Sequence, residues 1–390
     1  MLSEIHSKRN AGEWAEFYVL LNVLSEGRLY AADGSLNKLN DNYFPVISIE
    51  MQRSDSIKQN PIPVIYHVDT RNKEIKVESD GCTDYIKMID FKDEADRFFK
   101  IISSRKGRAF LVPEISSILD KLKNPVTKQS SSKKADIHIV IHDVMTGFEN
   151  EVGFSIKSKH SSPATLINAS GQTLFQYKIT KPYKINDTYE ISNLLEPHQY
   201  DRDDLPIDTG PKGRVKLLLE AGYFLSFNRI KSNNFQENIL IIDSSLDVIL
   251  SECLLVFMSS KITSLSEIVD IVAVKNPCNF TTKDSTRLLD FYKYKIKRLI
   301  VDAALGMQPK RPWSGEYDAS GGYIVVKETG DVVCYHLYNW NALQDYLYYN
   351  LRFETPSSTG QGSKKSYNYA LHYTEHNNDF MDICLQLRFK

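Results

Sequence analysis

The stretch that most constrains the fold is residues 133–160, KKADIHIVIHDVMTGFENEVGFSIKSKH. Two runs in which apolar and polar residues alternate, 135–142 and 152–159, flank a turn around Gly147. Alternation with a period of two is typical of β-strands, and a short turn pairs two strands antiparallel. The sequence therefore predicts a hairpin in which the end of the second strand returns to the start of the first.

The second strand of this hairpin carries two lysines where a buried strand usually excludes charge. Because successive side chains point to opposite faces of a strand, one face is mostly apolar. The other face holds small residues and both amines: Gly153, Ser155, Lys157 and Lys159. The antiparallel pairing brings Asp136, at the head of the first strand, towards Lys157.

A carboxylate and a lysine at one edge of a sheet suit metal-dependent hydrolysis. Magnesium takes a few hard oxygen ligands and keeps several waters. It lowers the pKa of a bound water and offsets charge on a phosphoryl oxygen. A lysine beside it can orient or deprotonate the attacking water, or stabilise the transition state. The pattern predicts Asp136 as a magnesium ligand and Lys157 as the catalytic amine.

This layout resembles the PD-(D/E)xK nucleases, which place one acid on a strand and an acid-x-Lys on the next. Here the second element is Ser155-Ile156-Lys157, so a serine stands in the place of the second acid. We expect Ser155 in the active site, and we expect a second metal-binding carboxylate from elsewhere in the chain.

The N-terminal helix, predicted over residues 7–26, can supply that carboxylate. The spacing Lys8…Gly12…Glu16 is similar to the first motif of MutH-type nucleases, which favours Glu16. The alternatives are Glu13, on the same helix, and the two acids that precede the lysine-bearing strand, Glu149 and Glu151.

Three blocks of the chain together resemble the HpaII-type restriction endonucleases. They are GEWAEFYVLLNVLSEGRLYAAD, the pair KKADIHIVIHD and GFSIKSKHSSPATLINAS, and RPWSGEYDASGGYIVVKETGDVVCYHLYN with the terminal LQLRFK. The resemblance implies a type II restriction enzyme that hydrolyses double-stranded DNA with Mg²⁺. The namesake cuts at CCGG, so that palindrome is the expected site. A palindrome implies a homodimer with two active sites. A companion DNA methyltransferase would protect the host genome.

Several polar residues are predicted to contact DNA. Lys159 suits a phosphate, and Thr165, Asn168 and Gln172 follow the lysine-bearing strand directly. Hydroxyl and amide side chains bond base edges or phosphates, and arginine is the usual reader of guanine. Arg311, in the stretch QPKRPW, is therefore the predicted guanine contact.

The expected fold class is mixed α/β, with a PD-(D/E)xK core sheet flanked by helices and an additional C-terminal α+β portion. A length of 390 residues allows two or three domains. We place a nuclease core with an inserted hairpin and helices at residues 1–204. Residues 213–390, which read as helices followed by a β-hairpin, are the predicted DNA-recognition and dimerisation part.

Composition excludes several function classes. No apolar run reaches the length of a membrane span, and the N-terminus lacks a secretory signal, so we expect a cytoplasmic protein. The five cysteines are scattered without a CxxC pair, which argues against a zinc knuckle. Three other functions stay open: a DNA-binding protein that does not cut, a MutH-like nicking repair enzyme and, more remotely, an enzyme that uses Lys157 as a Schiff-base amine.

Overall fold

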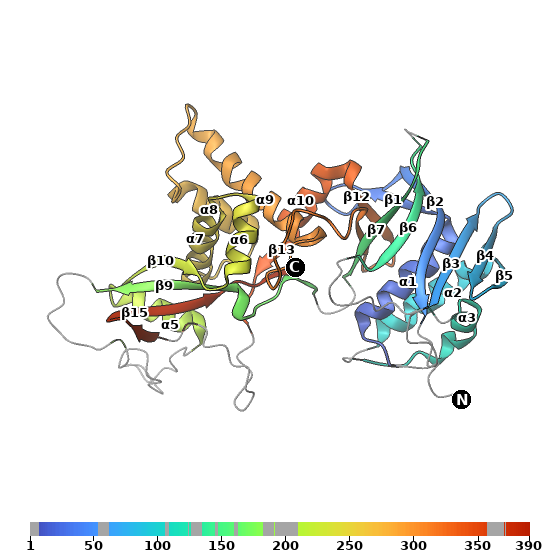
Figure 1. Cartoon of the computed structure of the whole chain (residues 1–390), viewed down its shortest axis with the longest axis horizontal. Helices are drawn as coiled ribbons and strands as arrows, with labels where there is room; N and C mark the ends of the chain where they lie inside the picture. The colour runs from blue at the N-terminus through green and yellow to red at the C-terminus, as the bar shows by residue number, and fades with distance from the viewer. Residues whose placement is uncertain are drawn as a thin grey trace. The chain divides into compact units, whose positions relative to one another are not determined.

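The chain folds into two compact units that interleave along the sequence. The computed structural model describes residues 8–53, 62–105, 109–123, 125, 135–144, 147–159, 163–181, 191, 210–356, 370 and 372–390. The first unit comprises Met1–Ala164, Ala304–Gly306 and Glu316–Tyr346, and the second comprises Thr165–Ala303, Met307–Gly315 and Leu347–Lys390. Each unit is described by itself below, with the elements labelled as in Figure 1.

Helix α1 (Ala11–Glu26) shows how local sequence sets the ends of an element. The Asn10 side chain accepts a hydrogen bond from the Glu13 amide, and the Glu13 carboxylate accepts one from the Asn10 amide. This reciprocal capping box satisfies two amides that a helix start leaves unpaired. The helix ends at Gly27, whose φ of 65° is easily reached only without a side chain. The predicted helix is confirmed, although the described helix begins at residue 11 rather than residue 7.

A nine-stranded sheet forms the centre of the first unit. Its order is β1-β12-β11-β7-β6-β2-β3-β4-β5. The strands are β1 (Arg28–Ala32), β2 (Lys38–Arg53), β3 (Ile62–Asp69), β4 (Glu74–Ser79), β5 (Cys82–Lys87), β6 (Ile137–His142), β7 (Glu149–Ser158), β11 (Gly322–Val326) and β12 (Val332–His336). The predicted hairpin is confirmed as β6 and β7, which pair antiparallel. On its other side β7 pairs with β11 in parallel, so a strand from the last third of the chain completes the sheet.

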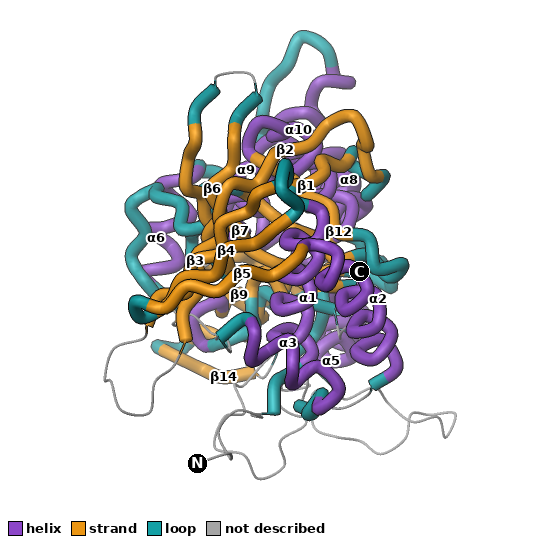
Figure 2. Tube along the Cα trace, turned by 90° about the vertical axis from the view of Figure 1, so that its right-hand side faces the viewer, coloured by secondary structure: helices purple, strands orange, loops and turns teal. Residues whose placement is uncertain are grey.

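Helices α1 and α2 (Met88–Ser104) lie on one face of this sheet, and Figure 2 shows them beside its strands. The apolar residues of α1, such as Phe17, form one buried cluster with Phe154 and Ile156 of β7 and with α3 (Ser116–Lys121). The apolar face of β7 predicted from sequence is therefore the core face.

Buried tyrosines occupy β11, β12 and α10 (Trp340–Asn350). The rings of Tyr335 and Tyr346 stack with centroids 4.7 Å apart, and Tyr323 is buried on the neighbouring strand. Gly322 opens β11 with a φ of 109°, and a Cβ there would collide with the Tyr335 carbonyl oxygen. The glycine thus lets β11 approach β12 closely enough for the two strands to pair.

The second unit combines helices with two smaller sheets. One sheet has the order β10-β9-β15-β14, and the other has the order β13-β16-β8. The strands are β8 (Thr165–Ile167), β9 (Leu174–Thr180), β10 (Phe224–Ile230), β13 (Leu351–Phe353), β14 (His372–Glu375), β15 (Asn378–Cys384) and β16 (Leu387–Phe389). The helices are α5 (Pro211–Glu220), α6 (Asn233–Ile242), α7 (Leu246–Ser259), α8 (Leu265–Lys275) and α9 (Leu288–Leu305).

The predicted mixed α/β class is confirmed, and its assignment to a PD-(D/E)xK core stays a prediction. The compact units differ from the predicted division between residues 204 and 213. Residues 316–346 belong to the first unit, in which β11 pairs with β7. Residues 165–303 belong to the second unit, in which β9 pairs with β10 and β15. The sequence also predicts a linker near residues 205–212, of which residues 205–209 lie outside the described residues.

His336, at the end of β12, gives the fold a measurable pH dependence. Burial lowers the pKa of its imidazole to about 4, although Asp143 opposes the shift. The folded protein therefore resists protonation that the unfolded chain accepts near pH 6.5, so stability falls as the pH drops from 6.5 towards 4. We expect roughly 2 kcal/mol of the unfolding free energy to disappear between pH 7 and pH 5 because of this residue.

The test compares His336→Asn with the wild type by urea denaturation at both pH values. Asparagine keeps an acceptor for the Tyr338 amide, which the His336 ring now caps over 3.2 Å. The variant should be less stable at pH 7 but should lose less stability on acidification. Parallel pH profiles for the two proteins would contradict the assignment.

Candidate active site

The β6–β7 hairpin brings Asp136 and Lys157 together. The Asp136 amide donates to the Phe154 carbonyl over 2.8 Å, which continues the pairing of Ile137 with Phe154. The Lys157 Nζ atom lies 4.0 Å from Asp136 Oδ2, and both side chains are about three-quarters buried, with exposed fractions of 22% and 27%. The approach expected from the antiparallel pairing is therefore present.

Ser155 stands between the amine and the carboxylate. Its Oγ accepts a hydrogen bond from Lys157 Nζ over 2.8 Å and donates one to Asp136 Oδ2 over 3.2 Å. The Ile156 amide donates to the same oxygen over 2.6 Å, while Lys157 Nζ also donates to the Ile156 carbonyl over 3.1 Å. Because Ser155 is only 1% exposed, these contacts hold the lysine and the aspartate in one arrangement.

Helix α1 contributes a second carboxylate to this place. Gly12, Ala15 and Glu16 line a hollow of about 210 Å³ together with Asp136, Ile156, Lys157, Ser158 and Ala164. All these residues belong to the first unit. The small side chains at positions 12 and 15 leave room beside Glu16, so that the helix presents a carboxylate to the end of the hairpin.

The three rival acids are engaged elsewhere. Glu13 accepts the capping hydrogen bond from the Asn10 amide over 2.8 Å. The carboxylate of Glu151 lies 3.3 Å from the His138 ring, and that of Glu149 lies 4.0 Å from the His142 ring, both histidines being on β6. Of these four described acids, Glu16 is the one that lines the hollow.

The chemistry of this donor set suits magnesium. Magnesium keeps several waters and is usually bound through one or two carboxylates together with substrate phosphates. Asp136 and Glu16 supply hard oxygens, and the contacts that described residues make with Asp136 all use Oδ2, which leaves Oδ1 for a cation. Within the described ranges no group of three or more histidine, cysteine or acidic side chains could hold a metal by itself. Two carboxylates of this kind fit a magnesium ion whose other ligands are water and phosphate.

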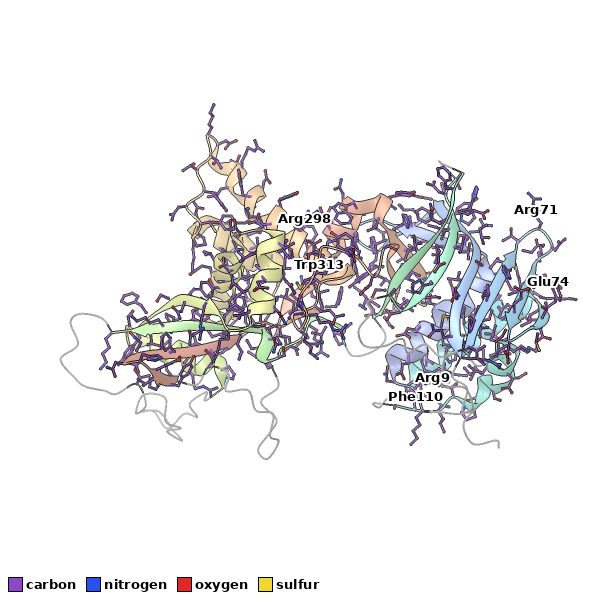
Figure 3. The ribbon with its side chains drawn as sticks, in the orientation of Figure 1. Arg9, Arg71, Glu74, Phe110, Arg298 and Trp313 are labelled. Atoms are coloured by element: carbon purple, nitrogen blue, oxygen red, sulfur yellow. The ribbon has the colours of Figure 1, made fainter. Side chains whose placement is uncertain are left out.

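Arg9 adds positive charge close to α1. Its Nη2 donates to the Pro125 carbonyl over 3.1 Å, its guanidinium carbon lies 5.0 Å above the Trp14 ring, and its backbone pairs with that of Phe110 (Figure 3). Burial lowers the pKa of the Arg9 guanidinium, whereas the charges of Glu13 and Glu16 oppose that shift. Arg9 thus places a positive charge near the two acids of α1.

Tyr323 is a member of the site that the sequence analysis did not identify. It pairs with Ser155 across β11 and β7, and its ring centroid lies 5.3 Å from Lys157 Nζ. Burial raises the pKa of the Tyr323 hydroxyl well above its ordinary value, and the charge of Asp136 adds to that shift while a hydrogen bond with Ser155 opposes it. The phenol therefore stays neutral and supports both Ser155 and Lys157.

Tyr323→Phe is expected to lower kcat for DNA cleavage about 10-fold, the lower end of the effect of outer-shell partners. Phenylalanine keeps the ring beneath Lys157 and removes only the hydroxyl that contacts Ser155. Steady-state kinetics on an oligonucleotide duplex should show an unchanged KM. A variant whose KM rises while kcat stays constant would assign Tyr323 to substrate binding instead.

The predicted DNA contacts divide between the two units. Lys159 belongs to the first, where its amide donates to the Val326 carbonyl over 3.0 Å. Thr165, Asn168, Gln172 and Arg311 belong to the second unit. The Gln172 Oε1 atom accepts a hydrogen bond from Ser232 over 2.7 Å, and the Arg311 carbonyl accepts one from buried Asn238 over 2.7 Å. Their contact with DNA stays a prediction.

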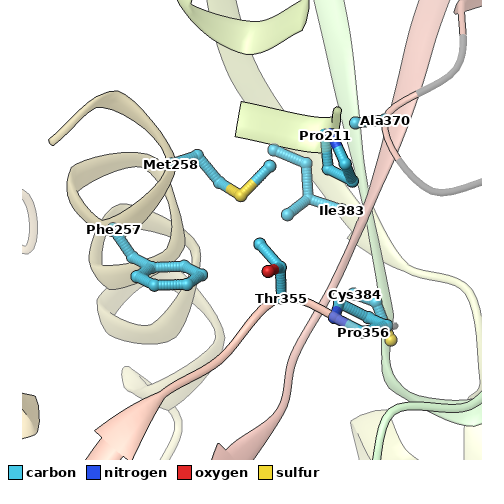
Figure 4. A pocket seen from close by; sticks show the side chains of 8 residues that line it. All are labelled: Pro211, Phe257, Met258, Thr355, Pro356, Ala370, Ile383 and Cys384. Atoms are coloured by element: carbon cyan, nitrogen blue, oxygen red, sulfur yellow. The ribbon is translucent and has the colours of Figure 1, made fainter. Parts of the chain in front are cut away.

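A second hollow lies in the second unit and is too small for a substrate. Its volume is about 10 Å³, near the lower limit for one water molecule. Figure 4 shows the side chains of Phe257, Met258 and Ile383 facing it. The larger hollow beside Asp136 is therefore the better candidate for chemistry.

The described part of the chain has no helix that is both long enough and apolar enough to cross a lipid bilayer.

Comparisons with known proteins agree with one another. Residues 10–389 match the family model described as HpaII restriction endonuclease. The Type II restriction enzyme HpaII of Haemophilus parainfluenzae is 36% identical over 382 residues, which cover 97% of this chain and 98% of that enzyme. No solved structure matches the chain. The chain therefore belongs to the HpaII family of restriction endonucleases.

Proposed function

We propose that this restriction endonuclease hydrolyses double-stranded DNA at a short palindromic site with magnesium, and that the hollow beside Asp136 is its active site. The observation that carries the proposal is the convergence of Asp136, Lys157 and Glu16 at the end of the β6–β7 hairpin. The resemblance to HpaII-type enzymes makes CCGG the site to test first.

In this proposal Asp136 and Glu16 hold the metal ion. When bound, the ion supplies a water of lowered pKa and offsets negative charge on the phosphate. Lys157 orients or deprotonates the attacking water, or stabilises the charge that develops as the phosphorus–oxygen bond breaks. Ser155 and Tyr323 position the Lys157 amine. The Ser155 hydroxyl accepts a hydrogen bond from it, and the Tyr323 ring lies against it.

We further propose that two copies of the chain act on one palindrome, because a two-fold symmetric site presents two equivalent bonds to cut. Residues 213–390, which include Arg311, would serve DNA recognition and dimerisation. Thr165, Asn168 and Gln172 would add further DNA contacts, and Lys159 a phosphate contact. A companion methyltransferase would protect the host DNA.

A DNA-binding protein that does not cut is the second candidate, and Ser155 is the observation that favours it. Serine cannot supply the charge of the acid that other PD-(D/E)xK nucleases carry at this position. Glu16 counts against this candidate, because it brings a second carboxylate to the same hollow. A MutH-like enzyme that nicks one strand is distinguished by its product.

The test is digestion of unmethylated plasmid DNA by the purified protein, with magnesium and with EDTA, followed by sequencing of the ends. The proposal predicts discrete double-strand fragments in magnesium alone. A sequence-selective gel shift without cleavage would support the binder, and an open circular product that persists would support the nicking enzyme.

A further inference from the structure

An arginine and an asparagine stand side by side on β10, the edge strand of the four-stranded sheet in the second unit. The pairing of β10 with β9 shifts register between Phe227 and Arg229, which makes a β-bulge. Because of the bulge, the consecutive residues Asn228 and Arg229 are both exposed, whereas regular alternation would turn one of them inward. Bulges of this kind re-aim side chains next to functional sites.

The side chain of buried Gln176 is hydrogen-bonded to both Asn228 and Arg229. Its Oε1 accepts hydrogen bonds from Asn228 Nδ2 over 2.7 Å and from Arg229 Nε over 3.2 Å. Its Nε2 donates to the Tyr373 hydroxyl over 2.6 Å. Gln176 is only 1% exposed, and both its amide oxygen and its amide nitrogen are hydrogen-bonded. It therefore fixes the positions of the Asn228 and Arg229 side chains.

The network continues across all four strands of this sheet. The Tyr373 hydroxyl donates to Asp382 Oδ1 over 2.8 Å, and Lys231 Nζ donates to Asp382 Oδ2 over 2.7 Å. Asp382 is 5% exposed and is neutralised by Lys231, which also lies 5.3 Å from the centroid of the Tyr373 ring. The exposed side chains that this network orients are thus the amide of Asn228 and the cations of Arg229 and Lys231.

Edge protection is the simpler explanation for charge on an outer strand, because lysine or arginine there discourages pairing with another chain. Edge protection needs no buried partner. Here a buried glutamine and a buried aspartate, drawn from two other strands, are committed to orienting the edge. A fully satisfied buried polar network specifies one geometry, which a protective charge does not require.

We propose that Arg229, with Asn228 beside it, reads a guanine edge in the major groove of the DNA target. The Nε of Arg229 is occupied by Gln176, while no described residue contacts its two terminal nitrogens, which form the fork that matches the O6 and N7 acceptors of guanine. Asn228 has its carbonyl oxygen to offer to a neighbouring base or water. Because β10 is the edge strand of the four-stranded sheet, it pairs with β9 on one side only, and Asn228 and Arg229 stand at that edge.

The inference deepens the proposed function, since it rests on DNA as the ligand. The experiment therefore measures binding separately from cleavage. Gel shifts in EDTA would use a duplex with the site that the wild type recognises, and duplexes in which each guanine–cytosine pair is changed in turn. The proteins are the wild type, Arg229→Ala, Arg229→Lys and the control Arg287→Ala. Arg287 is exposed in the second unit, and its side chain contacts no other described residue.

Arg229→Ala should lose about 10- to 100-fold in affinity for the intact site and should no longer distinguish the change at one guanine position. Arg229→Lys should behave similarly, because an ammonium keeps the charge but lacks the fork. Arg287→Ala should keep the discrimination of the wild type at every position.

Two results would overturn the inference: an Arg229→Ala protein with wild-type discrimination at every position, or an equal loss in Arg287→Ala. Its failure is separable from that of the proposed function. A wild type that binds selectively but never cuts would overturn the nuclease proposal while the binding data still decide on Arg229. A wild type without any selectivity would overturn both.

Discussion

Replacing Lys157 by alanine is expected to abolish DNA cleavage, with a fall in kcat of about 10³-fold or more, in the upper range for a positioned acid–base group. Lys157 is the one cationic side chain among the described residues that line the hollow, so its loss removes the group that can offset charge on the scissile phosphate. Single-turnover cleavage of a radiolabelled duplex measures this loss directly.

Lys159→Ala is the matched control, because it removes the same charge two residues along the same strand. It should reduce affinity for DNA a few-fold through a lost phosphate contact and should leave the single-turnover rate near that of the wild type. Equal cleavage by the wild type and Lys157→Ala would remove the amine from the mechanism. Equal losses in both variants would mean that general positive charge, rather than position, is what matters.

The second large effect is expected at Glu16. Glu16→Gln should lower kcat about 10²- to 10³-fold, as is typical when one charge-stabilising group is removed, because glutamine keeps the shape but loses the charge that would hold the metal. The apparent magnesium affinity should fall in parallel. Thermal unfolding with and without magnesium gives a readout that does not depend on turnover, since a bound ion stabilises the folded state.

Glu13→Gln is the control for this variant. Glutamine can replace glutamate in a capping box, so α1 should keep its N-terminal hydrogen bonds and the enzyme its activity. If Glu13→Gln lost activity and Glu16→Gln kept it, the second metal-binding carboxylate would be Glu13 rather than Glu16.

Local patterns predicted the parts of the site that lie close together in sequence. The alternation in residues 135–159 gave the hairpin, and Gly27 marked the end of α1. Asp136 and Lys157 are 21 positions apart, and the pairing of two adjacent strands brings them together. Tyr323 could not be found in this way. Tyr323 pairs with Ser155 although β7 ends at Ser158 and β11 begins only at Gly322. Nothing in the sequence of β11 itself specifies β7 as its parallel partner.

The polar network of the second unit was also beyond the sequence. Gln176, Tyr373 and Asp382 come from three separate strands, and each alone reads as an ordinary polar residue. The bulge at Asn228 does interrupt the alternation, since Leu225 and Phe227 are two residues apart whereas Ile230 follows Phe227 by three, but this break alone does not name the partners of the exposed side chains. Helix α6 does carry a local signal, since Ser232 caps its first turn by accepting a hydrogen bond from the Phe235 amide.

The late position of β11 has a consequence for the enzyme during its own synthesis. Strand β7 carries Lys157, the proposed catalytic amine, yet its parallel neighbour β11 and Tyr323 emerge from the ribosome long after it. A nascent chain that has reached only the middle of the sequence holds Lys157 on an open sheet edge. Domains tend to fold as complete units during translation, so cutting activity should arise only when the sheet closes. Unfinished chains would then be harmless to the DNA of the cell that makes them.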